Sequence, residues 1–339
     1  MVLASNIAVI LVNFRGASDT IACLDSLVAG KIVPHIILID NASSDDSLAR
    51  FTCWAQANSH NLARFRATAA DHPITDKSSP AWELRAEDDV NRRPLSPFTI
   101  IQSNTNWGFA GGCNLGLNLA LASPQIELFW LLNNDTVVTE ATAPAFVDAF
   151  SANPEWGMAG GPLRLFYQPD KLQLANGMRF HPLTAQATGI LAGQPADSVI
   201  DTNWVMDQTD FVSGASMCVS RRFLDVVGLM EPRFFLYYEE IDWAMRARGR
   251  FKIGYIPNAV VYHKEGATAG SPSGSGARTR SPLSEYHFTR SKLIFGAKHF
   301  PWLVPLYFCQ NIAIFLRRIL RRQPAQARAV LRASLGMKL

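Results

Sequence analysis

The chain has 339 residues, of which 48% are apolar and 18% are charged. With no long low-complexity tract, this composition is that of a globular protein with one large domain or two ordinary ones. The net charge of +4 is uneven, because seven basic residues and no acid lie beyond residue 300. The chain shows no zinc-finger spacing, helix-turn-helix pattern or basic surface interleaved with aromatic residues. We therefore expect no binding to nucleic acid.

The cysteines and the N-terminus both favour a cytoplasmic protein. The five cysteines are odd in number and widely spaced, which is typical of reduced thiols in a protein core. Residues 1–10 carry no charge ahead of their short apolar run, so we expect no signal peptide. No run reaches the roughly 18 uninterrupted apolar residues expected of a helix that spans a membrane.

Two strand-turn-helix units open the chain. Residues 7–12 are an apolar, β-rich run that stops at Asn13, and residues 19–27 then carry apolar side chains at helical spacing. Residues 36–39 repeat the apolar run and stop at Asp40, ahead of a serine and aspartate cluster that can cap a helix. Residues 55–97 break this pattern with four prolines, which predicts a surface insertion.

A glycine-rich turn at residues 104–112 follows the next predicted strand and leads into a helix. Glycines in such a turn let backbone N–H groups approach a ligand at the start of the helix. The spacing of Gly108, Gly111 and Gly112 is not that of the dinucleotide-binding G-x-G-x-x-G turn. The turn therefore disfavours a nicotinamide-dependent enzyme.

The most informative stretch is residues 129–136, where four apolar residues run directly into Asn133, Asn134 and Asp135. Four such residues fit a strand that is buried on both faces, and open α/β sheets bind ligands beyond the carboxyl ends of their strands. An Asx turn explains the polar cluster if it stands alone. Because other predicted strands end in the same way, at Asn13 and Asp40, we expect Asp135 to lie where a metal or a phosphate is held.

A second acidic cluster occupies residues 234–243, which mix aromatic residues with Glu239, Glu240 and Asp242. If a helix starts near Glu239, then Glu239 and Asp242 share one face, whereas Glu240 points about 100° away. Acids are common in a first helical turn, where they interact favourably with the helix dipole, and aromatic residues are common in a core. This stretch alone leaves a structural role and a functional role equally open.

A single histidine, His263, ends the last predicted strand. A histidine in such a place is more often structural than a metal ligand. Here it follows the acidic cluster and precedes a Gly/Ser/Pro-rich segment at residues 266–283, whose composition predicts a flexible loop. Its position keeps the ligand role open.

Together, these motifs resemble the family 2 inverting glycosyltransferases of the GT-A fold, in particular the bacterial rhamnosyltransferase-like branch. The resemblance is carried in chain order by residues 10–14, 39–45, 106–114, 133–135, 214–217, 238–242 and 263. It implies an α/β fold with a Rossmann-like, mostly parallel mixed sheet flanked by helices. The implied organisation is a GT-A catalytic domain at 1–265, the loop at 266–283 and a helical, basic, amphipathic region at 284–339.

The resemblance also implies a role for each motif. Asp135 and His263 would hold Mg²⁺ or Mn²⁺, which offsets the charge of a leaving diphosphate. Glu240 would be the general base for an acceptor hydroxyl, so that the anomeric configuration inverts, while Glu239 and Asp242 shape the site. The nucleotide sugar would contact Asn13, Asp40, Asn106, Gly108, Gly111, Gly112, Asn114, Asn133 and Asn134.

Two departures from the family pattern keep other functions open. Asn133 stands where the metal motif usually has an aspartate, and Glu240 stands where the base is commonly aspartate. A protein that binds a sugar nucleotide without catalysis is therefore the main alternative. A sugar-1-phosphate nucleotidyltransferase is disfavoured, since we find no N-terminal glycine-rich loop with a basic residue to hold a triphosphate.

The expected donor is dTDP-rhamnose or a UDP-sugar, and the expected acceptor is a glycan or a lipid-linked hydroxyl in cell-surface polysaccharide synthesis. In the tail, the apolar residues 302–308 and 312–316 precede four arginines between residues 317 and 322. Pro305, Gln310 and Asn311 interrupt the apolar run, so we expect the tail to lie on the inner face of a membrane rather than to cross it. Packing of its apolar face on the catalytic domain is the alternative.

Overall fold

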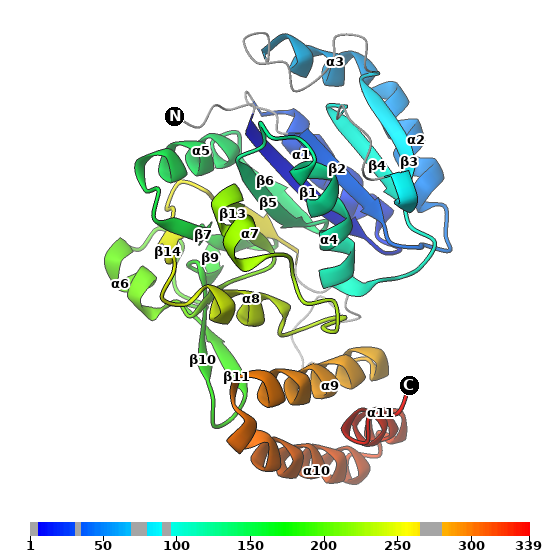
Figure 1. The fold of residues 1–339 in the computed structure, drawn as a ribbon, viewed down its shortest axis with the longest axis vertical. Coiled ribbons are helices and arrows are strands. Elements are labelled where there is room, and N and C mark those ends of the chain that lie inside the picture. The colour runs from blue at the N-terminus through cyan, green and yellow to red at the C-terminus, as the bar shows by residue number, and fades with distance from the viewer. Residues whose placement is uncertain (1–5, 31–34, 69–79, 90–95, 265–279) are drawn as a thin grey trace.

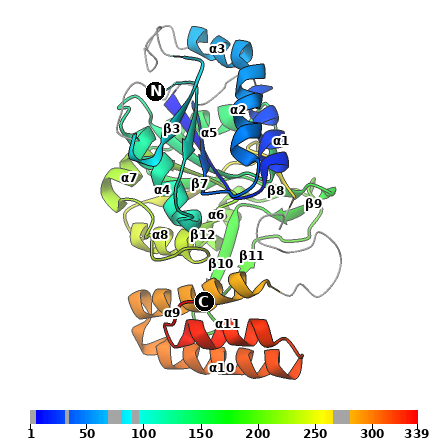
Figure 2. The same cartoon turned by 90° about the vertical axis from the view of Figure 1, so that its right-hand side faces the viewer.

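The computed structural model describes residues 6–30, 35–68, 80–89, 96–264 and 280–339. These residues form a large α/β domain with three C-terminal helices stacked against one end of it (Figures 1 and 2). The loop predicted at residues 266–283 lies outside the described residues as far as residue 279. The first C-terminal helix, α9, spans Pro282–His299.

An eight-stranded sheet forms the centre of the large domain, in the order β14-β7-β13-β5-β1-β2-β4-β3. Its strands are β1 (Ile7–Asn13), β2 (His35–Asp40), β3 (Trp82–Ala86), β4 (Phe98–Gln102), β5 (Leu128–Asn133), β7 (Trp156–Gly160), β13 (Ser216–Ser220) and β14 (Lys252–Tyr255). Its ladders are parallel except for the two made by β13, which runs antiparallel to β5 and β7. The predicted mostly parallel mixed sheet is thereby confirmed.

Helices cover both faces of this sheet, which is why its central strands read as unbroken apolar runs. Alternate side chains of β1 enter different cores, because successive residues of a strand point to opposite faces. Ile10 belongs to the core with α4 (Gly108–Leu121), whereas Val9 and Leu11 belong to the core with three other helices. These are α1 (Ala17–Val28), α2 (Ser47–Ala57) and α5 (Thr142–Ala152).

The stretch predicted as a surface insertion, residues 55–97, is partly built into the domain. After α2 and α3 (Ser59–Thr68), strand β3 adds to the edge of the sheet, parallel to β4. Among the residues of β3, only Arg85 is buried. An edge strand needs few buried residues, so its sequence lacks the apolar run that marks the central strands.

Two smaller sheets and three short helices complete the large domain. The four-stranded sheet has the order β6 (Thr136–Val138), β15 (Val261–His263), β8 (Leu163–Leu165) and β9 (Gln168–Leu174). The three-stranded sheet has the order β11 (Gln186–Gly189), β10 (Gly177–His181) and β12 (Phe211–Val212). The helices are α6 (Thr202–Gln208), α7 (Arg221–Val227) and α8 (Glu239–Ala247).

The C-terminal helices form a separate layer, with α10 (Val304–Leu320) farthest from the main sheet and α11 (Pro324–Ser334) beside it (Figures 1 and 2). The hairpin of β10 and β11 reaches this layer, where the Tyr307 hydroxyl donates a 2.6 Å hydrogen bond to the carbonyl of Pro182. The helical stretch Pro301–Leu320 is long and apolar enough to cross a membrane by length and composition, although Gln310, Asn311 and two arginines interrupt its apolar run.

Candidate functional site

Strand pairing brings Asp135 and His263 together. Asp135 follows β5 and precedes β6, which pairs antiparallel with β15 so that Thr136 lies opposite His263. His263 Nε2 lies 3.1 Å from Asp135 Oδ1, and both side chains are buried. The backbone N–H of Lys264 also donates to the carbonyl of Asp135. The two residues predicted as metal ligands are therefore neighbours, although 128 positions separate them in the chain.

The surroundings keep Asp135 ionised. Burial alone would raise the pKa of this carboxyl, but the hydrogen bond and charge of His263 outweigh it and lower the pKa. On its other side, His263 Nδ1 lies 2.8 Å from Gln173 Oε1, so Nδ1 carries a proton in this arrangement. In a metal-binding histidine, one ring nitrogen is commonly held by an outer partner while the other binds the ion; here the second nitrogen, Nε2, is the one that contacts Asp135.

One carboxylate and one imidazole fit a divalent ion that takes its remaining ligands from elsewhere. Mg²⁺ keeps several non-protein ligands and prefers oxygen, whereas imidazole tilts the preference toward a transition metal such as Mn²⁺. Within the part of the chain that the structure describes, no group of three or more His, Cys, Asp and Glu side chains could hold a metal. The ion would therefore depend on a ligand such as a diphosphate.

The ends of β1, β2 and β5 meet in one hydrogen-bond network. Asn13 Nδ2 donates to Asp40 Oδ1 at 3.0 Å and to Ser43 Oγ at 3.1 Å. The Asn13 Oδ1 atom accepts from Thr20 Oγ1 at 3.0 Å and from Asn134 Nδ2 at 3.3 Å. Three predicted nucleotide contacts, Asn13, Asp40 and Asn134, thus share one polar edge beside Asp135.

The side chain of Asn41 holds the glycine-rich turn against this edge. Its Nδ2 donates to Asn106 Oδ1 and to the carbonyl of Gly108, and its Oδ1 accepts from the N–H of Trp107. Gly108 has φ +70°, and a Cβ there would collide with the carbonyl of Phe235, so this position requires glycine. Asn41 was not among the predicted site residues, although it directly follows Asp40 in the motif.

The remaining predicted contacts of the turn have packing roles in the structure. A Cβ on Gly111 would come within 2.6 Å of the Trp107 side chain, and one on Gly112 would come within 2.8 Å of Val12. The Asn114 side chain bonds both the carbonyl and the N–H of Met230, at 2.8 and 3.1 Å. Their contact with a nucleotide stays a prediction.

Helix α8 starts at Glu239, where the sequence predicts a start. The two residues before it, Tyr237 and Tyr238, have φ values of 69° and 72°, which side chains other than glycine rarely adopt. Adjacent residues in this conformation cost energy that the surrounding packing must offset, and such strain clusters at functional sites. The Tyr238 hydroxyl secures the turn by donating to the carbonyl of Ala185 at 2.6 Å.

The first two acids of α8 lack a cationic partner in the described structure. Glu239 is buried, and its Oε2 has no hydrogen-bond partner. Glu240 is partly exposed and lies against Gly214, whose backbone N–H bonds its carboxyl group and where a Cβ would collide with it. Burial raises the pKa of both carboxyls, and the charge of Glu240 raises that of Glu239 further.

The third acid, Asp242, has the opposite environment. Its Oδ1 lies 2.7 Å from Lys298 Nζ and 2.7 Å from His299 Nε2, and its Oδ2 accepts from Arg246 Nε at 3.0 Å. Burial would raise its pKa, but the hydrogen bonds from His299 and Lys298 outweigh burial and lower it. Asp242 therefore anchors α9 on α8, while Glu240 faces away from it.

A short loop at residues 213–215 lies between the two acidic sites. The carbonyl of Ala215 accepts from the N–H of Asn133, beside the metal ligands, while Gly214 contacts Glu240. The glycine-rich turn adds a second link, since the N–H of Phe109 donates to the carbonyl of Phe235 at 2.8 Å. The loop and the turn thus connect the strand ends to α8 and to the segment just before it.

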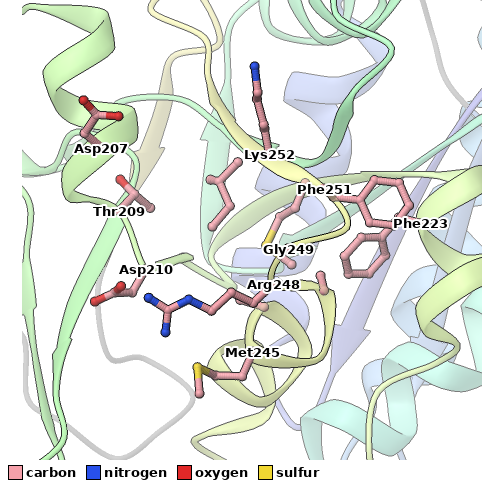
Figure 3. Close-up of a pocket in the computed structure, with 13 residues that line it drawn as sticks. Asp207, Thr209, Asp210, Phe223, Met245, Arg248, Gly249, Phe251 and Lys252 are labelled. Atoms are coloured by element: carbon pink, nitrogen blue, oxygen red, sulfur yellow. The ribbon is translucent and has the colours of Figure 1, made fainter.

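A hollow of about 230 Å³ lies elsewhere, at the far end of α8 (Figure 3). Met245 and Arg248 of that end line it together with Asp210 and Phe223. None of the residues predicted to bind metal, nucleotide or acceptor lines this hollow. It is therefore separate from the site described above.

One known structure identifies the fold, and a second is reported beside it. GalNAc-T7, solved with UDP, GalNAc and Mn²⁺, superposes with a TM-score of 0.54 and 12% identity over 85% of this chain and 47% of that one. The mannosyltransferase PcManGT from Pyrobaculum calidifontis, solved with GDP-Man and Mn²⁺, reaches 0.49 and 13% identity over 98% of this chain and 76% of that one. The fold is the GT-A fold of glycosyltransferases, as predicted.

No protein-family model matches the chain. It is similar to a curated protein, the low-salt glycan biosynthesis hexosyltransferase Agl10 of Haloferax volcanii, with 25% identity over 193 residues. The match covers 53% of each protein, so the chain spans about half the length of the curated relative it matches. The rhamnosyltransferase-like branch stays a prediction.

Proposed function

We propose that the protein is a metal-dependent, inverting glycosyltransferase that moves a sugar from a nucleoside-diphosphate sugar to a hydroxyl group. One observation carries the proposal: a carboxylate of lowered pKa, Asp135, and a carboxyl of raised pKa, Glu240, lie on either side of the loop at 213–215. Acids whose pKa values are pushed apart can take different roles, one as a permanent charge and one in proton transfer.

The donor would bind along the polar strand ends. Asp135 and His263 would hold Mg²⁺ or Mn²⁺, which supplies positive charge to the leaving diphosphate. Asp40 would accept a hydrogen bond from the nucleobase, and Asn13 and Asn134 would line the same edge. Two similar structures contain Mn²⁺ with a nucleotide or a nucleotide sugar, which supports a donor of this class.

The acceptor would bind on the side of α8. There Glu240 would take the proton of the acceptor hydroxyl as it attacks the anomeric carbon, and burial raises its pKa, which makes its carboxylate a stronger base. Direct displacement inverts the configuration. We propose dTDP-rhamnose or a UDP-sugar as donor and a glycan or lipid-linked acceptor in cell-surface polysaccharide synthesis, in the cytoplasm; the relative Agl10 is named for glycan biosynthesis.

A donor panel tests this proposal. The purified protein is incubated with dTDP-, UDP- and GDP-sugars, with Mn²⁺, Mg²⁺ or a chelator, and release of the nucleoside diphosphate is measured. We expect release from one donor class that depends on the metal, and NMR of the glycoside should show an inverted anomeric proton. Retained configuration would exclude the inverting mechanism, and full turnover in the chelator would exclude the metal.

A sugar-nucleotide-binding protein without catalysis is the second candidate. It is favoured by the single carboxylate, Asp135, at the metal site. Thermal shifts separate the two candidates, because a ligand at 100 times its Kd stabilises the fold by about 2.7 kcal/mol. A strong shift with a nucleotide sugar, but no turnover with any acceptor or water, would support the second candidate.

A further inference from the structure

Half of the surface of α10 is an exposed apolar stripe. At about 100° per residue, the exposed positions fall within one sector of roughly 180°. The stripe consists of Pro305, Leu306, Phe308, Cys309, Ile312, Ala313, Leu316, Ile319 and Leu320. Trp302, in the turn before the helix, is 71% exposed, and Leu320 at its end is 85% exposed. An apolar surface this continuous usually marks a binding face.

The opposite face of α10 is fixed to the protein. Tyr307 and Asn311 are buried there, and Gln310 Nε2 donates to the carbonyl of Leu183 at 2.8 Å. Arg318 on this face lies 2.6 Å from the buried carboxylate of Glu285 in α9. Crossing a membrane would break these contacts and place the Arg318 charge in hydrocarbon. The helix can therefore present its stripe without leaving the protein.

Positive charge borders the stripe. Arg317 lies at its edge, and Arg321 and Arg322 follow its end; all three are exposed, and the ion pairs of the described residues include none with these three. Residues 301–339 contain no acid that could neutralise them. Of the four arginines between residues 317 and 322, Arg318 thus forms an ion pair within the protein, and the other three remain available to a ligand. Apolar surface with arginines at its border is the pattern of a helix that lies in a bilayer interface.

We propose that the exposed stripe of α10 docks on an anionic lipid bilayer as an interfacial helix. The apolar side chains enter the headgroup boundary, and Arg317, Arg321 and Arg322 bind lipid phosphates. The inference stands apart from the proposed function. If both are right, docking brings a lipid-linked acceptor to the layer that borders α8, since Asp242 of α8 is anchored to Lys298 of α9.

Vesicle binding by the full chain tests the docking. We expect co-sedimentation with vesicles that contain one third phosphatidylglycerol and little with pure phosphatidylcholine. Ile312→Glu with Leu316→Glu should weaken binding at least tenfold, whereas Val199→Glu, on a fully exposed side chain elsewhere, should not. Circular dichroism and thermal melts confirm that each variant is folded. Equal recovery of wild type and stripe variant in the supernatant would overturn the proposal.

A second set of variants tests the charges. Replacing Arg317, Arg321 and Arg322 by glutamine should weaken binding by about fivefold per arginine. The control replaces three arginines of the large domain, Arg179, Arg222 and Arg250, and so changes the net charge equally. Equal weakening in both variants would point to non-specific attraction and would contradict docking through the tail.

The two exposed cysteines locate the contact. Cys309 lies in the stripe and Cys53 lies in α2, while Cys23, Cys113 and Cys218 are buried. A polarity-sensitive dye on Cys309, in a Cys53→Ser variant, should shift to the blue when anionic vesicles are added. The same dye on Cys53, in a Cys309→Ser variant, should not shift. Analytical ultracentrifugation without lipid adds a check: a stable dimer that Leu316→Glu dissociates, with no dye shift on vesicles, would assign the stripe to a second copy instead.

Discussion

The two acidic sites of this protein are built from similar side chains but differ in what surrounds them. Asp135 has a histidine at 3.1 Å, which lowers its pKa despite burial. Glu239 is also buried and Glu240 is partly exposed, but neither has a cation beside it in the described structure, so burial raises both pKa values. The comparison shows that partners, and not burial alone, decide which carboxyl stays charged.

Asp242 shows the same effect of charged partners within one helix. Two residues beyond Glu240, it is fully buried yet has a lowered pKa because Lys298 and His299 contact it. The three acids of α8 therefore fall into two kinds. Asp242 has cationic partners and a lowered pKa, whereas Glu239 and Glu240 have no cationic partner in the described structure and raised pKa values.

Glu240→Gln should remove the general base and lower kcat by about 10²–10⁴-fold while donor binding stays near normal. Steady-state kinetics and a donor binding titration measure the two quantities. Glu239→Gln is the matched comparison, with the same chemical change one residue earlier, and should keep most of the turnover. If Glu239→Gln proves inactive while Glu240→Gln works, the assignment of the base is wrong.

Gln173→Leu should weaken metal binding by about 10–100-fold, because it removes the hydrogen bond that orients His263. Mn²⁺ titration followed by electron paramagnetic resonance, with the donor diphosphate present, measures the affinity. Gln168→Leu changes the same residue type on the same strand, but at an exposed position, and should leave the affinity unaltered. Unchanged Mn²⁺ affinity in Gln173→Leu would contradict the site at Asp135 and His263.

Asp242→Asn should destabilise the fold by about 1–3 kcal/mol, because Lys298, His299 and Arg246 lose the charge that holds α9 on α8. Urea unfolding followed by circular dichroism gives the free energy of unfolding. Asp207→Asn, at an exposed position, is the control and should change it little. An equal free energy for wild type and Asp242→Asn would show that this ion pair has no anchoring role.

The smallest effect concerns the pH dependence of stability. The folded pKa of Glu239 is raised, so its contribution to stability is present below the ordinary value of 4.5 and is lost as the pH rises through the raised pKa. Glu239→Gln should flatten this decline. The stability contribution of Glu231 has the opposite pH dependence. Its pKa is lowered, chiefly by a hydrogen bond from Arg233, so its contribution to stability is lost as the pH falls through that lowered pKa. Parallel stability profiles for Glu239→Gln and Glu231→Gln would contradict the comparison.

Much of the fold could be predicted from local patterns. The unbroken apolar runs of β1, β2 and β5 indicated strands buried on both faces, and their polar ends indicated a ligand edge. The start of α8 was predicted at the right residue. Each of these signals lies within about ten residues of sequence, so no knowledge of distant partners is needed.

Only the tertiary structure shows which residues from distant parts of the chain contact each other. Nothing near His263 in the sequence shows that it meets Asp135 or that Gln173 fixes its other nitrogen, because the pairing of β6, β15, β8 and β9 sets both contacts. The separation of Asp242 from Glu240 was predictable from helical geometry, but its cations come from α9.

In the tail, too, the sequence alone does not show which partner each side chain has. Its sequence predicts an amphipathic helix with four arginines, and the structure shows that Arg318 is taken by Glu285 while the apolar stripe stays exposed. Edge strand β3 was missed because hydrogen bonding to β4, and not side-chain burial, holds it in the sheet. Periodicity determines which elements form, since it depends on neighbouring residues. The charge state and the partner of each side chain depend on which elements pack together, and that is settled only when the whole chain has folded.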